Sequence, residues 1–124
     1  MIRTRGLTHI HLVVRDLDCS VSFYQRVFGM EECAREGRHM VFLRTPGRED
    51  LITLNEDPRE AQEAGVNGGV SHFGFRLSEA GDLDSAVAEV EAAGGTLVKR
   101  GEHLPGVPFA YVRDPDGYLI ELLP

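Results

Sequence analysis

Two histidines and one glutamate stand at comparable places in similar stretches of the chain. His9 lies near the start of THIHLVV, His72 near the start of SHFGFRL, and Glu121 within LIELL. Two imidazoles and one carboxylate can hold a divalent metal on one side and leave other coordination positions open for a substrate. A structural zinc site has a fourth protein ligand. These residue types therefore predict a catalytic metal site.

The first half of the chain has the patterns of one helix and several strands. Residues 7–14 are apolar at nearly every second position, which predicts a strand. From Leu17 to Phe28 apolar residues recur with helical spacing, and Gly29 supplies a helix C-cap. Short strands are then predicted at about 31–35, 39–44 and 51–55. The predicted order is βαβββ.

The same order repeats in the second half. A strand is predicted in SHFGFRL, a helix from about Leu83 to Gly94, and strands in TLVKR, PFAYV and YLIEL. We therefore expect an α+β fold in which two βαβββ modules form a curved mixed sheet around a metal cleft. The chain would be a single domain over 1–124, with module 1 at about 1–55, a linker at about 56–69 and module 2 at about 70–124.

Strand alternation predicts which side chains face this cleft. When the two halves are superposed, His9 corresponds to His72 and Thr53 to Glu121. Because alternate residues of a strand face opposite sides, one set should pack beneath the helices: Ile10, Leu12, Val14, Phe73, Phe75 and Leu77. The cleft face would then carry His9, His11, Thr53, His72, Gly74, Arg76 and Glu121. Arg76 could bind a substrate carboxylate there, and the choice between His9 and His11 as the first metal ligand stays open.

Composition excludes several classes of partner. Thirteen basic and twenty acidic residues give a net charge of −7, which disfavours nucleic acid and anionic membranes. No apolar run approaches the roughly 20 residues of a membrane-spanning helix. The N-terminus lacks an export signal, so we expect a cytoplasmic protein. Cys19 and Cys33 are expected to be buried or half-buried apolar residues.

Four segments resemble the vicinal oxygen chelate superfamily: HIHLVVRDL, SVSFYQRVFGM, SHFGF and DPDGYLIEL. This superfamily includes glyoxalase I, fosfomycin-resistance enzymes, methylmalonyl-CoA epimerase, extradiol dioxygenases and bleomycin-resistance proteins. The resemblance implies paired βαβββ modules and the metal ligands His9, His72 and Glu121. It also implies a small-molecule substrate and a homodimer.

Residues 101–121, GEHLPGVPFAYVRDPDGYLIE, are similar to the extradiol dioxygenase signature, with Ala110 in place of a larger apolar residue. This similarity implies a metal that binds a catecholate and dioxygen, with Fe(II) favoured and Mn, Ni, Zn or Co as alternatives. Tyr111 would bond a substrate oxygen, and His103 would lie beside the metal ligands. The usual catalytic histidine has no counterpart in DLITLNEDP, which makes His11 the nearest replacement base.

Other members of the superfamily remain alternatives. Glyoxalase I has a glutamate, and the epimerase a glutamine, where this sequence has Thr53. We expect Thr53 to contact the substrate. Fosfomycin transferases have threonine or cysteine at the position of His11 and a basic C-terminal segment. Bleomycin-resistance proteins bind a cationic drug without these metal ligands. A glyoxalase-type lyase, a fosfomycin-type thiol transferase and a non-catalytic drug-binding protein therefore stay open beside the dioxygenase.

Overall fold

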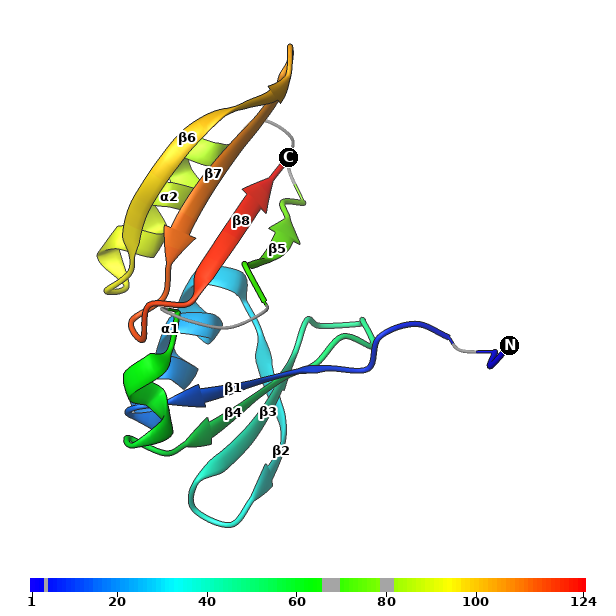
Figure 1. The fold of residues 1–124 in the computed structure, drawn as a ribbon, viewed down its shortest axis with the longest axis vertical. Coiled ribbons are helices and arrows are strands. Elements are labelled where there is room, and N and C mark those ends of the chain that lie inside the picture. Colours follow the sequence, from blue (N-terminus) through cyan, green and yellow to red (C-terminus); the bar gives the residue numbers. More distant parts are fainter. Residues whose placement is uncertain (4, 66–69, 79–81) are drawn as a thin grey trace.

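The structure is a computed structural model in which residues 1–3, 5–65, 70–78 and 82–124 are described. The elements are β1 (Ile10–Val14), α1 (Leu17–Phe28), β2 (Glu31–Glu36), β3 (Met40–Arg44), β4 (Ile52–Glu56), the 3-10 helix η1 (Glu60–Glu63), β5 (Phe73–Arg76), α2 (Leu83–Ala92), β6 (Thr96–Leu104), β7 (Val107–Arg113) and β8 (Leu119–Leu123) (Figure 1). The order βαβββ thus occurs twice, and the predicted α+β fold is confirmed.

Strands β1–β8 form two four-stranded sheets, ordered β1-β4-β3-β2 and β5-β8-β7-β6. In each sheet the first strand lies at an edge and runs parallel to the last strand of its module, while the other pairs are antiparallel. The eight predicted strands therefore hydrogen-bond as two units of four. The edges at β1 and β5 retain backbone groups that can pair with another strand.

The register makes the two modules equivalent residue by residue. His11 is the partner of Thr53 across β1 and β4, and Gly74 is the partner of Glu121 across β5 and β8. His9 and His72 each lie two residues before the first member of these pairs. The correspondence predicted from the sequence is therefore present in the strand pairing.

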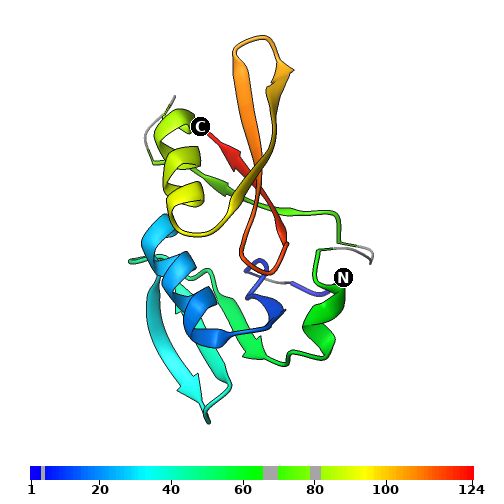
Figure 2. The same ribbon diagram turned by 90° about the vertical axis from the view of Figure 1, so that its left-hand side faces the viewer.

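Helix α1 begins and ends at the predicted residues because both caps are local. The side chain of Asp16 accepts a hydrogen bond from the backbone N–H of Cys19, and Gly29 closes the helix in the left-handed conformation, with φ of 62°. The two helices lie one above the other along one side of the molecule (Figure 2). Both modules contribute to one apolar core. The predicted inward-facing set lies in or against it, with Leu12 and Val14 buried and Ile10, Phe73, Phe75 and Leu77 half-buried.

Several local predictions need correction. Strand β6 continues to Leu104, beyond the predicted end at Arg100, because it forms a long hairpin with β7. Both Cys19 and Cys33 are exposed, so their predicted burial was wrong. Cys33 lies on the edge strand β2, every residue of which is exposed. Among the described residues, neither helix has the length and apolar character needed to cross a bilayer.

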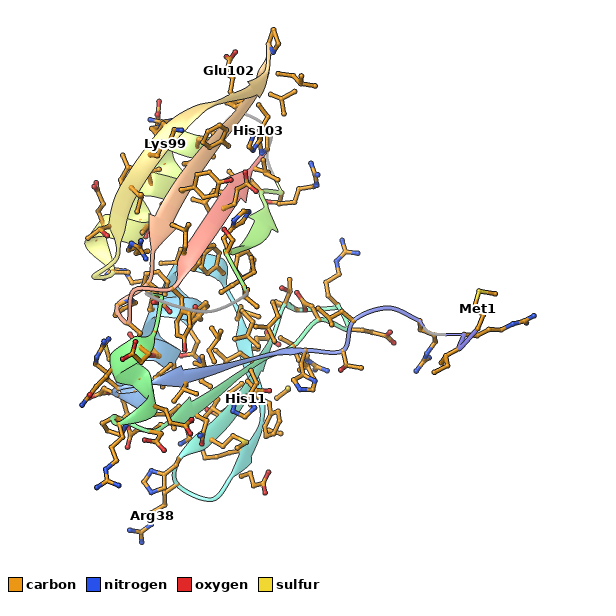
Figure 3. The ribbon with its side chains drawn as sticks, in the orientation of Figure 1. Met1, His11, Arg38, Lys99, Glu102 and His103 are labelled. Carbon is orange, nitrogen blue, oxygen red and sulfur yellow. The ribbon has the colours of Figure 1, made fainter. Side chains whose placement is uncertain are left out.

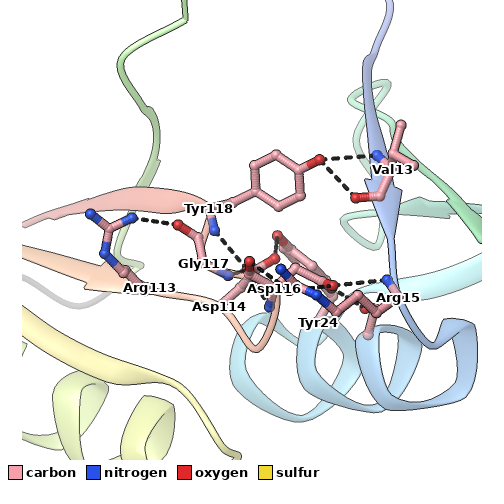
Figure 4. A network of polar contacts seen from close by, with 9 residues as sticks. Val13, Arg15, Tyr24, Arg113, Asp114, Asp116, Gly117 and Tyr118 are labelled. Atoms are coloured by element: carbon pink, nitrogen blue, oxygen red, sulfur yellow. Dashed lines mark hydrogen bonds and ion pairs between the residues drawn. The ribbon is translucent and has the colours of Figure 1, made fainter. Parts of the chain in front are cut away.

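The turn between β7 and β8 joins the two modules. The backbone N–H of Arg15 and the hydroxyl of Ser20 donate to the carboxylate of Asp116, at 2.8 and 2.9 Å. The hydroxyl of Tyr118 donates to the carbonyl of Val13, at 2.7 Å. We call residues 114–118 the inter-module turn (Figure 4).

Asp114 is the most deeply buried acid of the inter-module turn. Its Oδ2 accepts a hydrogen bond from the buried hydroxyl of Tyr24 at 2.8 Å, and its Oδ1 accepts from backbone N–H groups, including that of Tyr118 at 2.9 Å. Burial raises the pKa of Asp114 to about 6 although these bonds act to lower it. A satisfied network of this kind fixes how the second module sits on the first.

Candidate metal centre

Glu121 lies on the face of β8 that points away from the core, between the buried residues Ile120 and Leu122. Its carboxylate is contacted by two imidazoles. The Nε2 atom of His72 is 3.3 Å from Oε2, and the Nε2 atom of His103 is 2.5 Å from Oε1. The carboxylate side chain is 12% exposed, so its charge lies in a partly desolvated position.

The strand register explains why these groups meet. Tyr111 of β7 and Gly74 of β5 are the partners of Glu121 on either side. A Cβ atom at Gly74 would lie 3.1 Å from the Glu121 carbonyl oxygen and 3.5 Å from its Cβ. The glycine therefore lets β5 approach the backbone of Glu121 closely. His72, two residues before Gly74, reaches the carboxylate.

Tyr111 completes the surroundings of the carboxylate. Its ring meets the ring of His72 edge to face, with centroids 5.0 Å apart. Desolvation and then the charge of Glu121 raise the pKa of Tyr111, so its hydroxyl keeps its proton. For Glu121, desolvation acts to raise the pKa, but the contacts with His103, Tyr111 and His72 together outweigh it and lower the pKa.

The remaining predicted site residues lie apart from this group. His9 is exposed, and its Nδ1 lies 2.8 Å from the hydroxyl of its neighbour Thr8. Figure 3 shows His11 on the sheet of the first module and His103 on the long hairpin of the second. Thr53 is only 2% exposed, and its predicted contact with a substrate stays a prediction. Arg76 donates to the backbone carbonyl of Pro124 at 2.7 Å.

One chain brings together two of the three predicted metal ligands, His72 and Glu121. Over the ranges that the structure describes, no three His, Cys, Asp or Glu side chains are grouped closely enough to hold a metal ion. His9 therefore does not join the other two within one chain. A neutral imidazole nitrogen and a carboxylate oxygen on adjacent strands are nevertheless suitable donors for a divalent cation.

Two cavities flank the edge strands β1 and β5. One of about 520 Å³ has His11 and His72 in its wall, together with Phe73 and Tyr118. The other, of about 660 Å³, has His9 and Arg76 in its wall. Each cavity therefore combines residues of both modules, with a mixed polar and apolar wall in the first and a mainly apolar wall in the second.

Phe109 is the residue near Glu121 that the sequence did not single out. Gly74 was predicted on the cleft face, and its missing side chain lets β5 approach the Glu121 backbone. Phe109 looked like one more apolar residue of PFAYV, yet its ring stacks on His103 with centroids 4.3 Å apart. Strand parity with Tyr111 was the signal that could have placed Phe109 on the cleft face.

The family model described as "Glyoxalase/Bleomycin resistance protein/Dioxygenase superfamily" matches residues 6–122. The chain belongs to this superfamily. An uncharacterized protein of Pseudomonas aeruginosa, PA2024, is 33% identical over 119 residues, which cover 93% of this chain and 85% of that protein. A protein of Vibrio parahaemolyticus named "Probable lactoylglutathione lyase" is 30% identical, and the match covers 94% of this chain and 88% of the lyase.

Solved structures of the superfamily have the same fold. The fosfomycin resistance protein FosX of Listeria monocytogenes superposes with a TM-score of 0.77 at 27% identity, over 99% of this chain and 93% of FosX. The superfamily therefore includes relatives with different activities on the same pair of modules. Fold membership does not select among these reactions, which depend on the residues around the site.

Proposed function

We propose that this protein is a divalent-metal enzyme that acts on a small molecule with two neighbouring oxygen atoms. The observation that carries the proposal is the meeting of His72, His103 and Tyr111 around the single carboxylate of Glu121. We infer that His72 and Glu121 hold the metal and that His9 of a second copy completes the set. Fe(II) and Mn(II) are the favoured ions, because both accept a set of two histidines and one carboxylate with open positions.

A second copy is inferred because the ligands are divided between the modules. His9 and His72 occupy equivalent positions, yet His9 does not reach Glu121 within the chain. The inter-module turn fixes the two modules in this relation. The exposed edges at β1 and β5 would let the first module of one copy meet the second module of another. A symmetric dimer would then have two equivalent sites.

The residues around the site have separate tasks in this proposal. When bound, the metal supplies Lewis-acid chemistry toward the substrate oxygens. Tyr111 keeps its proton and can donate a hydrogen bond to a substrate oxygen. His103, whose Nε2 is within bonding distance of Glu121, is placed to exchange a proton with a substrate hydroxyl.

Extradiol cleavage of a catechol is the specific reaction that we propose first. It is supported by Tyr111 and His103, which match the dioxygenase signature and both lie beside Glu121. A glyoxalase-type lyase is the second candidate, supported by the similarity to the Vibrio parahaemolyticus lyase. Against the lyase, Thr53 replaces the carboxylate that this reaction would use in the first module.

The test begins with metal-free protein that is loaded anaerobically with Fe(II) or Mn(II). We expect about one ion per chain, a spectral change on addition of catechol, and oxygen uptake with a yellow ring-opened product when air is admitted. Conversion of the methylglyoxal–glutathione hemithioacetal without catechol cleavage would replace the dioxygenase by the lyase. A protein that binds neither metal would overturn the enzyme proposal and favour a drug-binding role.

A further inference from the structure

Phe109 is buried on the face of β7 that does not belong to the core. The ring is 6% exposed, whereas the core takes Ala110 and Val112 from the same strand. Because adjacent residues of a strand face opposite sides, Phe109 shares the face of Tyr111. Its burial must therefore come from groups on the cleft face.

His103 covers Phe109, and Gly101 gives the ring its space. The rings of His103 and Phe109 are stacked, with centroids 4.3 Å apart and planes at 24°. Gly101 is the cross-strand partner of Phe109, and a Cβ atom there would lie 2.9 Å from the Cζ atom of the ring. The phenyl ring thus fits between the glycine backbone and the imidazole.

The strand itself does not fix the direction of His103. The pairing of β6 with β7 shifts register between Glu102 and Leu104, so His103 lies at an irregular position of the hairpin. The ring of Phe109 also meets Tyr111 at 61°, with centroids 5.1 Å apart. One buried ring therefore contacts two of the side chains that surround Glu121.

We propose that Phe109 is a positioning residue whose ring holds His103 against the carboxylate of Glu121. The contact geometry stands on its own, and its consequence for catalysis rests on the proposed function. Gly101 contributes to the same arrangement, because a side chain there would displace the phenyl ring from its present position. Loss of the ring would let His103 leave Glu121 while the sheet beneath it stays intact.

The test is the NMR spectrum of the imidazole protons in the metal-free protein. In the wild type, ring current from Phe109 should shift the His103 resonances upfield. In Phe109→Leu these resonances should move downfield toward those of an unstacked histidine, and the contacts between the His103 ring and the Glu121 side chain should weaken. Phe42→Leu is the matched control, since it removes a half-buried ring from the other sheet and should leave the His103 resonances unchanged.

Gly101→Ala is the second variant and keeps every ring. It should shift the His103 resonances as well, through displacement of Phe109, even if Phe109→Leu fails to fold. Unchanged His103 resonances in a folded Phe109→Leu or Gly101→Ala protein would overturn the proposal.

Measurements of Mn(II) affinity distinguish failure of the role proposed for Phe109 from failure of the proposed metal-enzyme function. If Phe109 acts through His103, Phe109→Leu should change the affinity for Mn(II) in the wild-type background and leave it unchanged in a His103→Ala background. Equal changes in both backgrounds would assign Phe109 a general structural role and overturn the proposal. Wild-type protein that bound no Mn(II) would overturn the metal-enzyme proposal, and the His103 resonances would still decide the role of Phe109.

Discussion

The two modules share one strand register but carry different chemistry at equivalent positions. In the second module the pair across the parallel strands is Gly74 and Glu121, and in the first it is His11 and Thr53. Glu121 is a partly exposed carboxylate with two imidazoles on its oxygens, whereas Thr53 is a buried hydroxyl. Each module keeps a histidine two residues before its pair, at His9 and His72.

This difference shows how a duplicated module can divide one site. In the proposed site, the second module would supply the negative charge and the proton-transfer groups. The first supplies one exposed imidazole, that of His9. Neither module alone contains all three proposed ligands, His9, His72 and Glu121. Because His9 does not reach the other two within one chain, the proposed site requires complementary halves of two copies to meet.

The largest effect is expected from removing the carboxylate that distinguishes the second module. Glu121→Ala should weaken Mn(II) binding by roughly a hundredfold or more, because loss of a ligand should cost at least as much as loss of an outer-shell partner. Isothermal titration of the metal-free protein measures this. Thr53→Ala is the equivalent change in the first module and should leave the affinity nearly unchanged. Similar losses in both variants would remove the distinction between the modules.

The inter-module turn should be the next most sensitive region. Asp116→Ala removes the acceptor for Arg15 and for the buried hydroxyl of Ser20, and should lower the free energy of unfolding by about 2 to 3 kcal/mol. Urea unfolding followed by circular dichroism measures it. As a control, Asp84→Ala breaks an exposed ion pair with Arg100 and should cost less than about 1 kcal/mol. Equal costs would mean that the turn does not fix the relation of the modules.

Asp114 predicts a smaller effect that depends on pH. Its pKa is raised to about 6 in the folded protein from an ordinary value of 3.8, so the folded state binds the proton more tightly than the unfolded state. This contribution to stability is complete below about pH 4 and is lost as the pH rises to about 6. Asp114→Asn removes this titration. As the pH rises from about 4 to about 6, the unfolding free energy of the wild type should therefore fall by on the order of 2 kcal/mol relative to that of the variant. A constant difference between variant and wild type would contradict the raised pKa.

The smallest effect is expected at His11. Its equivalent in the second module is Gly74, which has no donor atom, whereas the equivalent of His9 is the proposed ligand His72. His11→Ala should therefore keep the wild-type metal content in an elemental analysis, while His9→Ala should lose it. The reverse result would identify His11 as the first ligand.

Local signals made much of the fold predictable. The bounds of α1 follow from an aspartate N-cap and a glycine C-cap, and strand alternation placed Leu12 and Val14 in the core. Local signals of this kind do not predict contacts between segments that are distant in the sequence. DPDG predicts a turn, but nothing local shows that Asp114 would bond Tyr24, 90 positions away.

The candidate site was also predictable only in part. Residue types and the repeat indicated His72 and Glu121, and the structure brings them together. The position of His103 depends on the irregular pairing of a long hairpin and on a stack with Phe109, which no spacing rule reveals. The proposed division of the ligands between two copies depends on how the modules pack, and the sequence pattern would be the same for a site within one chain.

Complementation between two defective variants is the direct test of a metal site shared between two copies. His9→Ala and Glu121→Ala are each expected to lose the metal as homodimers. If the site forms between copies, a mixed dimer has one site in which His9 of one chain meets His72 and Glu121 of the other, all intact. Co-refolding the two variants should therefore restore Mn(II) binding at up to one site per mixed dimer. Mixed dimers that form but bind no Mn(II) would contradict a site shared between two copies.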